Sequence, residues 1–282
     1  MVNFKDIQKP YFIGEIGINH NGDLQIAKKL IDAVCACSWD CAKFQKRNPD
    51  VCVPEHQKGV PRETPWGTMT YLDYKHRIEF EKKEYDYIDH YSKQKPIDWT
   101  ASVWDLDSLD FMTQYDVPFL KIPSAKITSL DLLAESAKSG IPIIMSTGMS
   151  ELREVDTAVN EVLKHTDNLV LMHTNSSYPS PESELNLSLI PFYKERYDCV
   201  IGYSGHEMDL EPTVVAVVLG AKVIERHITL SHDMWGTDQK SSLEVVAMDM
   251  LYKRIKNIDI MIGEPIKHVT KSEVPIKKKL RG

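Results

Sequence analysis

The chain has 282 residues, with 34 basic and 41 acidic side chains and a formal charge of −7. This length is typical of one (β/α)8 barrel, and the charge gives no basic surface that would attract nucleic acid. No apolar run approaches the roughly 18 residues of a membrane span, and the start of the chain lacks the apolar core of a signal peptide. We therefore expect a cytoplasmic protein whose five cysteines are thiols.

Short apolar runs alternate with helix-like segments along the whole chain. This alternation predicts one (β/α)8 TIM barrel over residues 1–266, followed by a lysine-rich linker or tail at 267–282. The predicted strands are residues 11–19, 40–47, 97–103, 118–123, 141–148, 169–178, 200–206 and 223–229. The predicted helices are residues 23–37, 106–115, 129–139, 151–165, 211–219 and 243–261.

One long interruption follows the second predicted strand, at residues 48–77. It mixes proline, glycine and aromatic residues with charge. A loop of this length on a compact domain is more often a lid or binding loop than an idle connection, and the alternative is a disordered excursion. Its position after a barrel strand predicts that it lies over the mouth of the barrel.

Two lysines, Lys43 and Lys121, lie inside apolar strands. A buried ammonium is costly without a partner, so either an anionic ligand or a carboxylate such as Glu15 or Glu225 must lie nearby. With serine hydroxyls at neighbouring strand ends, namely Ser102, Ser124 and Ser146, these lysines suit a small phosphorylated acid. No P-loop or GxGxxG motif supports nucleotide binding.

Glu15 and two histidines are the other candidates for chemistry. Glu15, between glycines, can act as acid or base or pair with a lysine. His206 and His227 end neighbouring strands, where neutral imidazoles can bind a divalent metal and leave positions open for water and substrate. The alternative is that each ring fills a polar niche. His20 is a further candidate, and His173 is expected in the core.

Nine motifs together resemble the sialic acid synthase family, whose members condense phosphoenolpyruvate with an N-acylated hexosamine. They match in order from about Tyr11 to Glu244. The motifs are Gly14-Glu15-Ile16-Gly17-Ile18-Asn19-His20-Asn21-Gly22, Lys43-Phe44-Gln45, Trp66-Gly67 with Tyr71 and Lys75, Lys121-Ile122-Pro123-Ser124, Ser146-Thr147-Gly148-Met149, Tyr178-Pro179, Ile201-Gly202-Tyr203-Ser204-Gly205-His206, Glu225-Arg226-His227-Ile228-Thr229 and Trp235-Gly236-Thr237-Asp238.

The resemblance implies a set of roles. His206 and His227 would bind Mn²⁺ or Mg²⁺, which polarises the sugar aldehyde. Phosphoenolpyruvate would be held by Lys43, Ser102, Lys121, Ser124, Ser146, Ser176 and Ser204. The sugar or the attacking water would meet Glu15, Gln45, Tyr178 and Asp238. The resemblance also implies a homodimer.

The chain departs from the family pattern in three places. Pro123 replaces a frequent glycine, and Asn175-Ser176-Ser177 replaces a common Cys-Thr-Asn or Cys-Thr-Ser run, so Asn175 and Ser176 are both candidates for ligand contact. Bacterial members usually carry a C-terminal antifreeze-like domain whose arginine contacts the sugar in the partner's site. The final residues resemble the start of the linker to that domain, so the domain was lost or cut away, or the site closes by other means.

Two alternatives stay open at this point. A related synthase could make a 3-deoxy-ulosonic acid from a phosphorylated aldose, which requires additional cationic residues for a second phosphate. The barrel could also be catalytically idle and serve as a sugar-binding or regulatory subunit. The sugar's identity depends on the loop after the second strand, where Arg62, Trp66, Tyr71, Tyr74 and Lys75 are expected to shape the choice.

Overall fold

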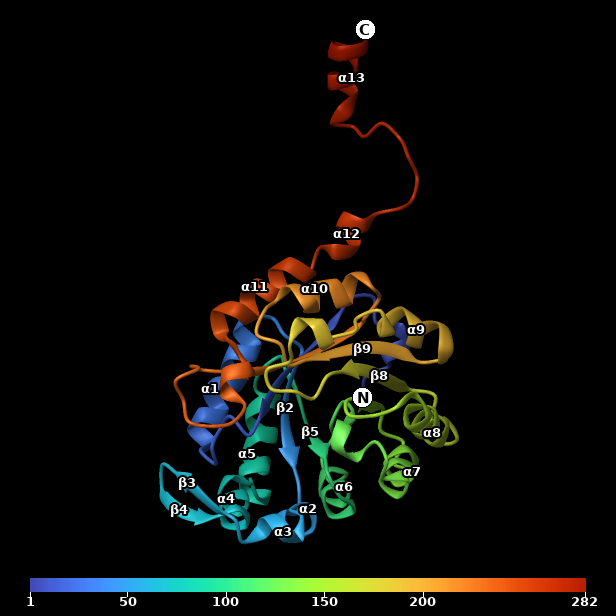
Figure 1. The fold of residues 1–282 in the computed structure, drawn as a ribbon. Coiled ribbons are helices and arrows are strands. Elements are labelled where there is room, and N and C mark those ends of the chain that lie inside the picture. The colour runs from blue at the N-terminus through green and yellow to red at the C-terminus, as the bar shows by residue number, and fades with distance from the viewer.

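The computed structural model describes all 282 residues and contains a closed barrel of eight parallel strands (Figure 1). The strands are β1 (Tyr11–Gly17), β2 (Cys41–Lys46), β5 (Asp98–Val103), β6 (Leu120–Ile122), β7 (Ile143–Ser146), β8 (Leu169–Thr174), β9 (Val200–Gly205) and β10 (Val223–Thr229). Strand β1 pairs with both β2 and β10, which closes the sheet. The predicted (β/α)8 fold is confirmed.

Helices cover the outside of the barrel. They are α1 (Leu24–Ala36), α5 (Lys82–Lys93), α6 (Leu106–Met112), α7 (Leu130–Lys138), α8 (Leu152–Leu163), α9 (Leu189–Arg196), α10 (Glu211–Val218) and α11 (Val245–Ile255). Helix α1 begins where expected, because Asp23 caps it by accepting from the backbone N–H groups of Gln25 and Ile26. The single helix expected over 243–261 is wrong: β11 (Leu243–Glu244) precedes α11, and α12 (Ile258–Ile262) starts anew after Asn257.

The N-terminal end of the barrel is filled by apolar side chains. Phe4, in the short helix η1 (Phe4–Asp6), is 1% exposed and packs edge-on against Tyr11 and Phe119. Ile144 and Val170 belong to the same inner cluster. Because this end is plugged, polar side chains that point inward from the strands have open space only at the C-terminal end, where active sites of this fold lie.

The long segment after β2 is folded. It contains α2 (Pro49–Cys52), α3 (Glu55–Lys58), the antiparallel hairpin β3 (Pro61–Thr64) and β4 (Gly67–Thr70), and α4 (Tyr71–Ile78). Tyr74 and Ile78 of α4 pack on Ile18, just after β1. The segment is therefore attached to the mouth of the barrel, as a binding loop requires, and the disordered alternative does not hold.

The C-terminal residues leave the barrel after α12. Helix α13 (Glu273–Arg281) stands away from it at the end of an extended connection (Figure 1), and all its residues are exposed. The division at residue 266 stays a prediction. None of the helices is both long enough and apolar enough to cross a membrane.

Candidate active site

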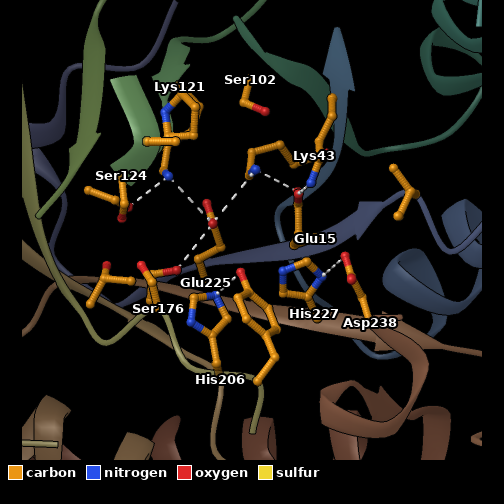
Figure 2. Close-up of a pocket in the computed structure, with 18 of the residues that line it drawn as sticks. Glu15, Lys43, Ser102, Lys121, Ser124, Ser176, His206, Glu225, His227 and Asp238 are labelled. Atoms are coloured by element: carbon orange, nitrogen blue, oxygen red, sulfur yellow. Dashed lines mark hydrogen bonds and ion pairs between the residues drawn. The ribbon is translucent and has the colours of Figure 1, made fainter. Parts of the chain in front are cut away.

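The C-terminal ends of the strands surround a cavity of about 350 Å³ (Figure 2). Every site residue predicted from the sequence lines it, with the exception of Asn175. These residues are Glu15, Lys43, Gln45, Ser102, Lys121, Ser124, Ser146, Ser176, Tyr178, Ser204, His206, His227 and Asp238.

Strand geometry explains why residues so far apart in the sequence meet. Successive side chains of a strand point to opposite faces, so Lys43 and Gln45 point inward while Phe44, between them, joins the outer core. In register, Glu15 lies between Lys43 on β2 and His227 on β10. The pairing of three strands thus places a carboxylate, an ammonium and an imidazole side by side.

Two lysines and two glutamates form the floor of the cavity (Figure 2). Lys43 Nζ lies 2.5 Å from Glu15 Oε2 and 3.6 Å from Glu225 Oε1, and Lys121 Nζ lies 3.6 Å from the same Glu225 oxygen. Lys121 Nζ also donates to Ser146 Oγ at 2.8 Å. All four charged side chains are at most 6% exposed, so their charges interact in a medium of low polarity.

The two carboxylates have very different acidities. Burial raises the pKa of Glu15 to about 7, although the nearby Lys43 ammonium acts in the opposite direction. Burial also disfavours the charged form of Glu225, but Lys121 and Lys43 outweigh it and lower its pKa to about 2. Paired groups whose pKa values are pushed apart are typical of acid–base sites. Glu15 is thus the group that can exchange a proton near neutral pH.

The lysines differ in a similar way. Burial lowers the pKa of Lys121 to about 8 despite the Glu225 carboxylate. Burial acts on Lys43 too, but Glu15 and Glu225 together outweigh it and raise the Lys43 pKa. The floor therefore holds one firmly charged ammonium and one that an anionic ligand would stabilise.

The rings of His206 and His227 lie side by side with their centroids 5.4 Å apart, and the Tyr178 ring packs against both, at 4.1 Å from His206 and 5.6 Å from His227. His206 Nδ1 donates to the carbonyl oxygen of Asn175 at 2.5 Å, so its Nε2 carries a lone pair, to which the Tyr178 hydroxyl donates at 2.8 Å. His227 Nδ1 is buried without a hydrogen-bond partner, 3.9 Å from Asp238 Oδ2.

This pair fits a divalent metal with open coordination positions. Burial lowers the pKa of His206 to about 4 and lowers that of His227, so both rings are neutral, as metal ligands must be. No cluster of three or more His, Cys, Asp or Glu side chains accompanies them. Two protein nitrogens leave room for water or substrate oxygens, which suits Mn²⁺ or Mg²⁺ in a catalytic rather than a structural role.

Other sequence candidates lie elsewhere. The Asn175 side chain donates to the carbonyl oxygen of Glu184 and lines a neighbouring cavity, so only its backbone reaches the site, through His206. His20 is stacked on Phe80 at 3.9 Å, and burial lowers its pKa to about 3, so it fills a structural niche. His173, in the core as expected, contacts the carbonyl oxygen of Leu185.

Several lining residues were not predicted as site residues. The sequence indicates Glu225 only as a structural partner of a lysine, but in the structure it contacts both lysines. Arg47 follows Lys43 and Gln45 at the same period of two, which is the signal that could have identified it. The other additional lining residues are Ile18, Trp104, Pro123, Ala125, Met149, Thr174 and Thr237. Of the five loop residues expected to shape the choice of sugar, only Lys75 lines the cavity.

Comparisons with known proteins agree with this architecture. The NeuB family model matches residues 30–267. N,N'-diacetyllegionaminic acid synthase of Campylobacter jejuni is 35% identical over 95% of this chain and 81% of its own. Human N-acetylneuraminate-9-phosphate synthase is 34% identical over 97% and 77%. The N-acetylneuraminic acid synthetase of Leptospira borgpetersenii, solved with citrate, superposes with a TM-score of 0.86 at 30% identity, over 97% and 93% of the two chains.

Proposed function

The chain belongs to the NeuB family, and we propose that it condenses phosphoenolpyruvate with an N-acylated hexosamine to give a nonulosonic acid and phosphate. The acceptor is N-acetylmannosamine, its 6-phosphate or a derivative. One observation carries the proposal: two buried ammonium groups and two neutral imidazoles line the same cavity. The names of the relatives support the same reaction class.

Phosphoenolpyruvate binds at the floor of the cavity. Its phosphate and carboxylate oxygens take hydrogen bonds from Lys43 and Lys121, which then share their charge with the ligand as well as with Glu225. The serine hydroxyls around these lysines complete the cradle, namely Ser102, Ser124, Ser146, Ser176 and Ser204. This arrangement fixes the enol carbon C3 toward the histidines.

The acceptor sugar binds above, as its open-chain aldehyde. His206 and His227 would hold Mn²⁺ or Mg²⁺, which would supply Lewis-acid polarisation of the aldehyde oxygen. Gln45, Tyr178 and Asp238 contact the sugar hydroxyls, and Asp238 Oδ2 lies 3.9 Å from His227 Nδ1. Holding both reactants in one geometry turns an encounter between two substrates into a reaction within one complex.

The bonds change in a balanced sequence. C3 of phosphoenolpyruvate attacks the aldehyde carbon, whose oxygen takes up a proton, and the electron-poor C2 accepts a water molecule. Glu15 removes the proton of that water, which its pKa near 7 permits. The C2–O bond to the phosphate then breaks as the new C2 hydroxyl becomes the keto group, leaving a 2-keto-3-deoxy acid and inorganic phosphate. The two protons of the water end on the former aldehyde oxygen and on the departing phosphate.

A homodimer in the cytoplasm belongs to the same proposal. The five cysteines are all unpaired, which suits a reducing compartment. Val218 on α10, Val246 on α11 and Ile260 on α12 are more than half exposed, and such an apolar surface is typical of a subunit interface.

The reaction is tested by incubating the protein with phosphoenolpyruvate, Mn²⁺ and N-acetylmannosamine or its 6-phosphate. We expect a 2-keto-3-deoxy acid and one phosphate per turnover, and loss of both after chelation or in His206→Ala. His90→Ala, an exposed histidine, is the matched control and should retain activity. Binding of both substrates without product would favour the idle sugar-binding barrel, and normal turnover after chelation would remove the metal from the account.

A further inference from the structure

Arg47 and Trp104 line the cavity, and the proposed condensation gives neither of them a role. In register, Gln45 on β2 pairs with Ser102 on β5, and Arg47 and Trp104 follow two residues later, just past the ends of the same two strands. Side chains two residues apart on a strand point the same way, so all four reach the cavity. The Arg47 guanidinium stacks on the Trp104 indole, with Cζ 4.7 Å from the ring centroid.

Both members of this stacked pair are hydrogen-bonded to the residue two positions before them. Trp104 Nε1 donates to Ser102 Oγ at 3.1 Å. The Arg47 guanidinium donates to the side-chain oxygen of Gln45, and the amide nitrogen of Gln45 donates in turn to Glu15 Oε1 at 3.0 Å. Indole and guanidinium groups can only donate, so Ser102 Oγ and the Gln45 oxygen must be the acceptors.

For Ser102, the direction of this hydrogen bond decides what the hydroxyl can do. A hydroxyl oxygen that accepts from Trp104 keeps its own proton to donate, and Ser102 donates to no protein atom. Its side chain lines the cavity, although the residue is only 1% exposed. The proton of Ser102 is therefore available to a ligand in the cavity.

Two other serines beside the floor of the cavity are held in the same way. Ser124 Oγ accepts from the backbone N–H of Gly148 at 3.0 Å, and Ser146 Oγ accepts from the Lys121 ammonium at 2.8 Å. Their hydroxyl protons are also left to donate. A fully ionised phosphate accepts hydrogen bonds and donates none, so hydroxyls whose protons are free match it.

For Gln45, the contact with Arg47 decides which end of the amide meets Glu15. Because Arg47 takes the amide oxygen, the amide NH2 group faces the carboxylate. Arg47 is itself held from two sides, by the Trp104 ring and by the Glu79 carboxylate, whose Oε2 lies 3.5 Å from Arg47 Nε. A planar guanidinium held in this way is a rigid donor.

On these grounds, and resting on the proposed condensation, we propose that Trp104 and Arg47 are positioning residues. Trp104 turns the Ser102 hydroxyl so that it donates to phosphoenolpyruvate, and Arg47 holds the Gln45 amide against Glu15. Trp104 therefore acts on the binding of phosphoenolpyruvate, and Arg47 acts on turnover.

The role of Trp104 is tested by titrating phosphoenolpyruvate calorimetrically into Trp104→Phe, Ser102→Ala and the double variant. The phenyl ring still offers Arg47 a face but has no N–H. We expect binding to weaken about 10- to 100-fold in Ser102→Ala and about 2- to 10-fold in Trp104→Phe, as for hydrogen bonds with charged and neutral partners. Once Ser102 is alanine, Trp104→Phe should change binding by less than about twofold. Trp99→Phe, which removes an indole N–H that donates to Asp89 from the same strand, is the control and should bind normally.

A spectroscopic readout does not depend on the ligand. With ¹⁵N-labelled tryptophan, the indole Nε1–H signal that is missing in Trp104→Phe belongs to Trp104. We expect this signal to shift in Ser102→Ala while the other tryptophan signals stay in place. An unshifted Trp104 signal, or a Trp104→Phe effect on binding that is the same with and without Ser102, would overturn the role of Trp104.

The role of Arg47 is tested through kcat in Arg47→Met, Gln45→Ala and the double variant. In Arg47→Met, the Glu79 carboxylate keeps Lys46 as a partner, with Nζ 3.4 Å from Oε1, so no unpaired buried charge is left. The Gln45 amide is then free to turn away from Glu15. We expect kcat to fall about tenfold, as for a small misplacement of a group at the reacting centre, with little change in the affinity for phosphoenolpyruvate.

In the Gln45→Ala background, Arg47→Met should cause no further fall in kcat. A fall of the same size with and without Gln45 would overturn the role of Arg47. The control is Arg196→Met at the end of α9, where an arginine lies over the Tyr197 ring away from the cavity. This variant should retain the kcat of the wild type.

Failure of this inference is distinguishable from failure of the proposed function. A wild type that condenses phosphoenolpyruvate with a hexosamine, but shows additive effects in both sets of variants, would overturn the positioning roles alone. A wild type that binds no phosphoenolpyruvate would overturn the proposed function. The indole signal, and the same titrations with inorganic phosphate, would then still decide whether Trp104 orients Ser102.

Discussion

At the scale of single residues, the proposed reaction depends on Glu15 as its general acid or base. Glu15→Gln retains the size and the contact with Gln45 but removes the group whose pKa lies near 7. We expect kcat to fall by about 10²- to 10⁴-fold, the usual contribution of a general acid or base, with phosphoenolpyruvate still bound. Steady-state kinetics together with direct titration of phosphoenolpyruvate checks both parts. Loss of binding without loss of kcat would assign Glu15 to the ligand cradle instead.

Lys121 predicts a pH dependence. Burial lowers its pKa to about 8, so in the free protein the ammonium is present below pH 8 and is lost as the pH rises above it. Only the ammonium attracts an anionic ligand, so kcat/KM for phosphoenolpyruvate should fall about tenfold per pH unit above pH 8. The bound ligand stabilises the ammonium, so kcat should fall only at higher pH. A profile of kcat/KM that stays flat to pH 10 would contradict the assignment.

Most of the site could be predicted at this scale, because strand ends in a barrel converge whatever their separation in sequence. Glu225 and Arg47 show the limit. The sequence predicts that Glu225 can pair with a lysine. Only the structure shows that its carboxylate lies between Lys43 and Lys121. The backbone carbonyl group of Asn175 accepts a hydrogen bond from His206. Every residue type has such a carbonyl group, so the sequence cannot indicate this contact.

At the scale of elements, β9 and β10 are joined behind the histidines by a buried ion pair. Arg226 and Glu207 adjoin His227 and His206 in sequence, and Arg226 NH1 lies 2.9 Å from Glu207 Oε1 with both side chains at most 2% exposed. Glu207 also accepts from the Tyr203 hydroxyl. This pair ties the end of β9 to β10, beside the two histidines that are proposed to bind the metal.

Arg226→Met should therefore destabilise the fold, because it leaves the buried Glu207 carboxylate without its partner. We expect a loss of about 3–5 kcal/mol in the free energy of unfolding, measured by urea titration. Arg254→Met, which breaks an exposed ion pair between α11 and Glu211, is the control and should leave the midpoint nearly unchanged. If the two variants had the same urea midpoint of unfolding, the buried ion pair would not stabilise the fold.

Elements with clear caps were predictable, and those decided by tertiary contacts were not. The start of helix α1 could be predicted from its cap, Asp23. The break at Asn257 between α11 and α12 could not, because no glycine or proline marks it. The hairpin Pro61–Thr70 and helix α4 form because Tyr74, Trp66 and Trp235 pack over the mouth, a contact between segments far apart in sequence.

At the scale of the whole molecule, the exposed apolar side chains of α10, α11 and α12 predict an interface between two copies. Sedimentation should give about twice the 32.3 kDa mass of one chain. Val246→Glu should shift the protein toward monomer, since a charge would be buried at the interface. Phe192→Glu on α9, equally apolar but outside this surface, should not. A monomeric wild type would contradict the homodimer.

The central claim is that a cation held by His206 and His227 lies in the same cavity as the phosphoenolpyruvate held by Lys43 and Lys121. The most direct measurement is the ³¹P relaxation rate of bound phosphoenolpyruvate in protein loaded with paramagnetic Mn²⁺. The account predicts strong enhancement in the wild type, lost in His227→Ala although phosphoenolpyruvate still binds. Bound phosphoenolpyruvate whose ³¹P relaxation is insensitive to Mn²⁺ would contradict it.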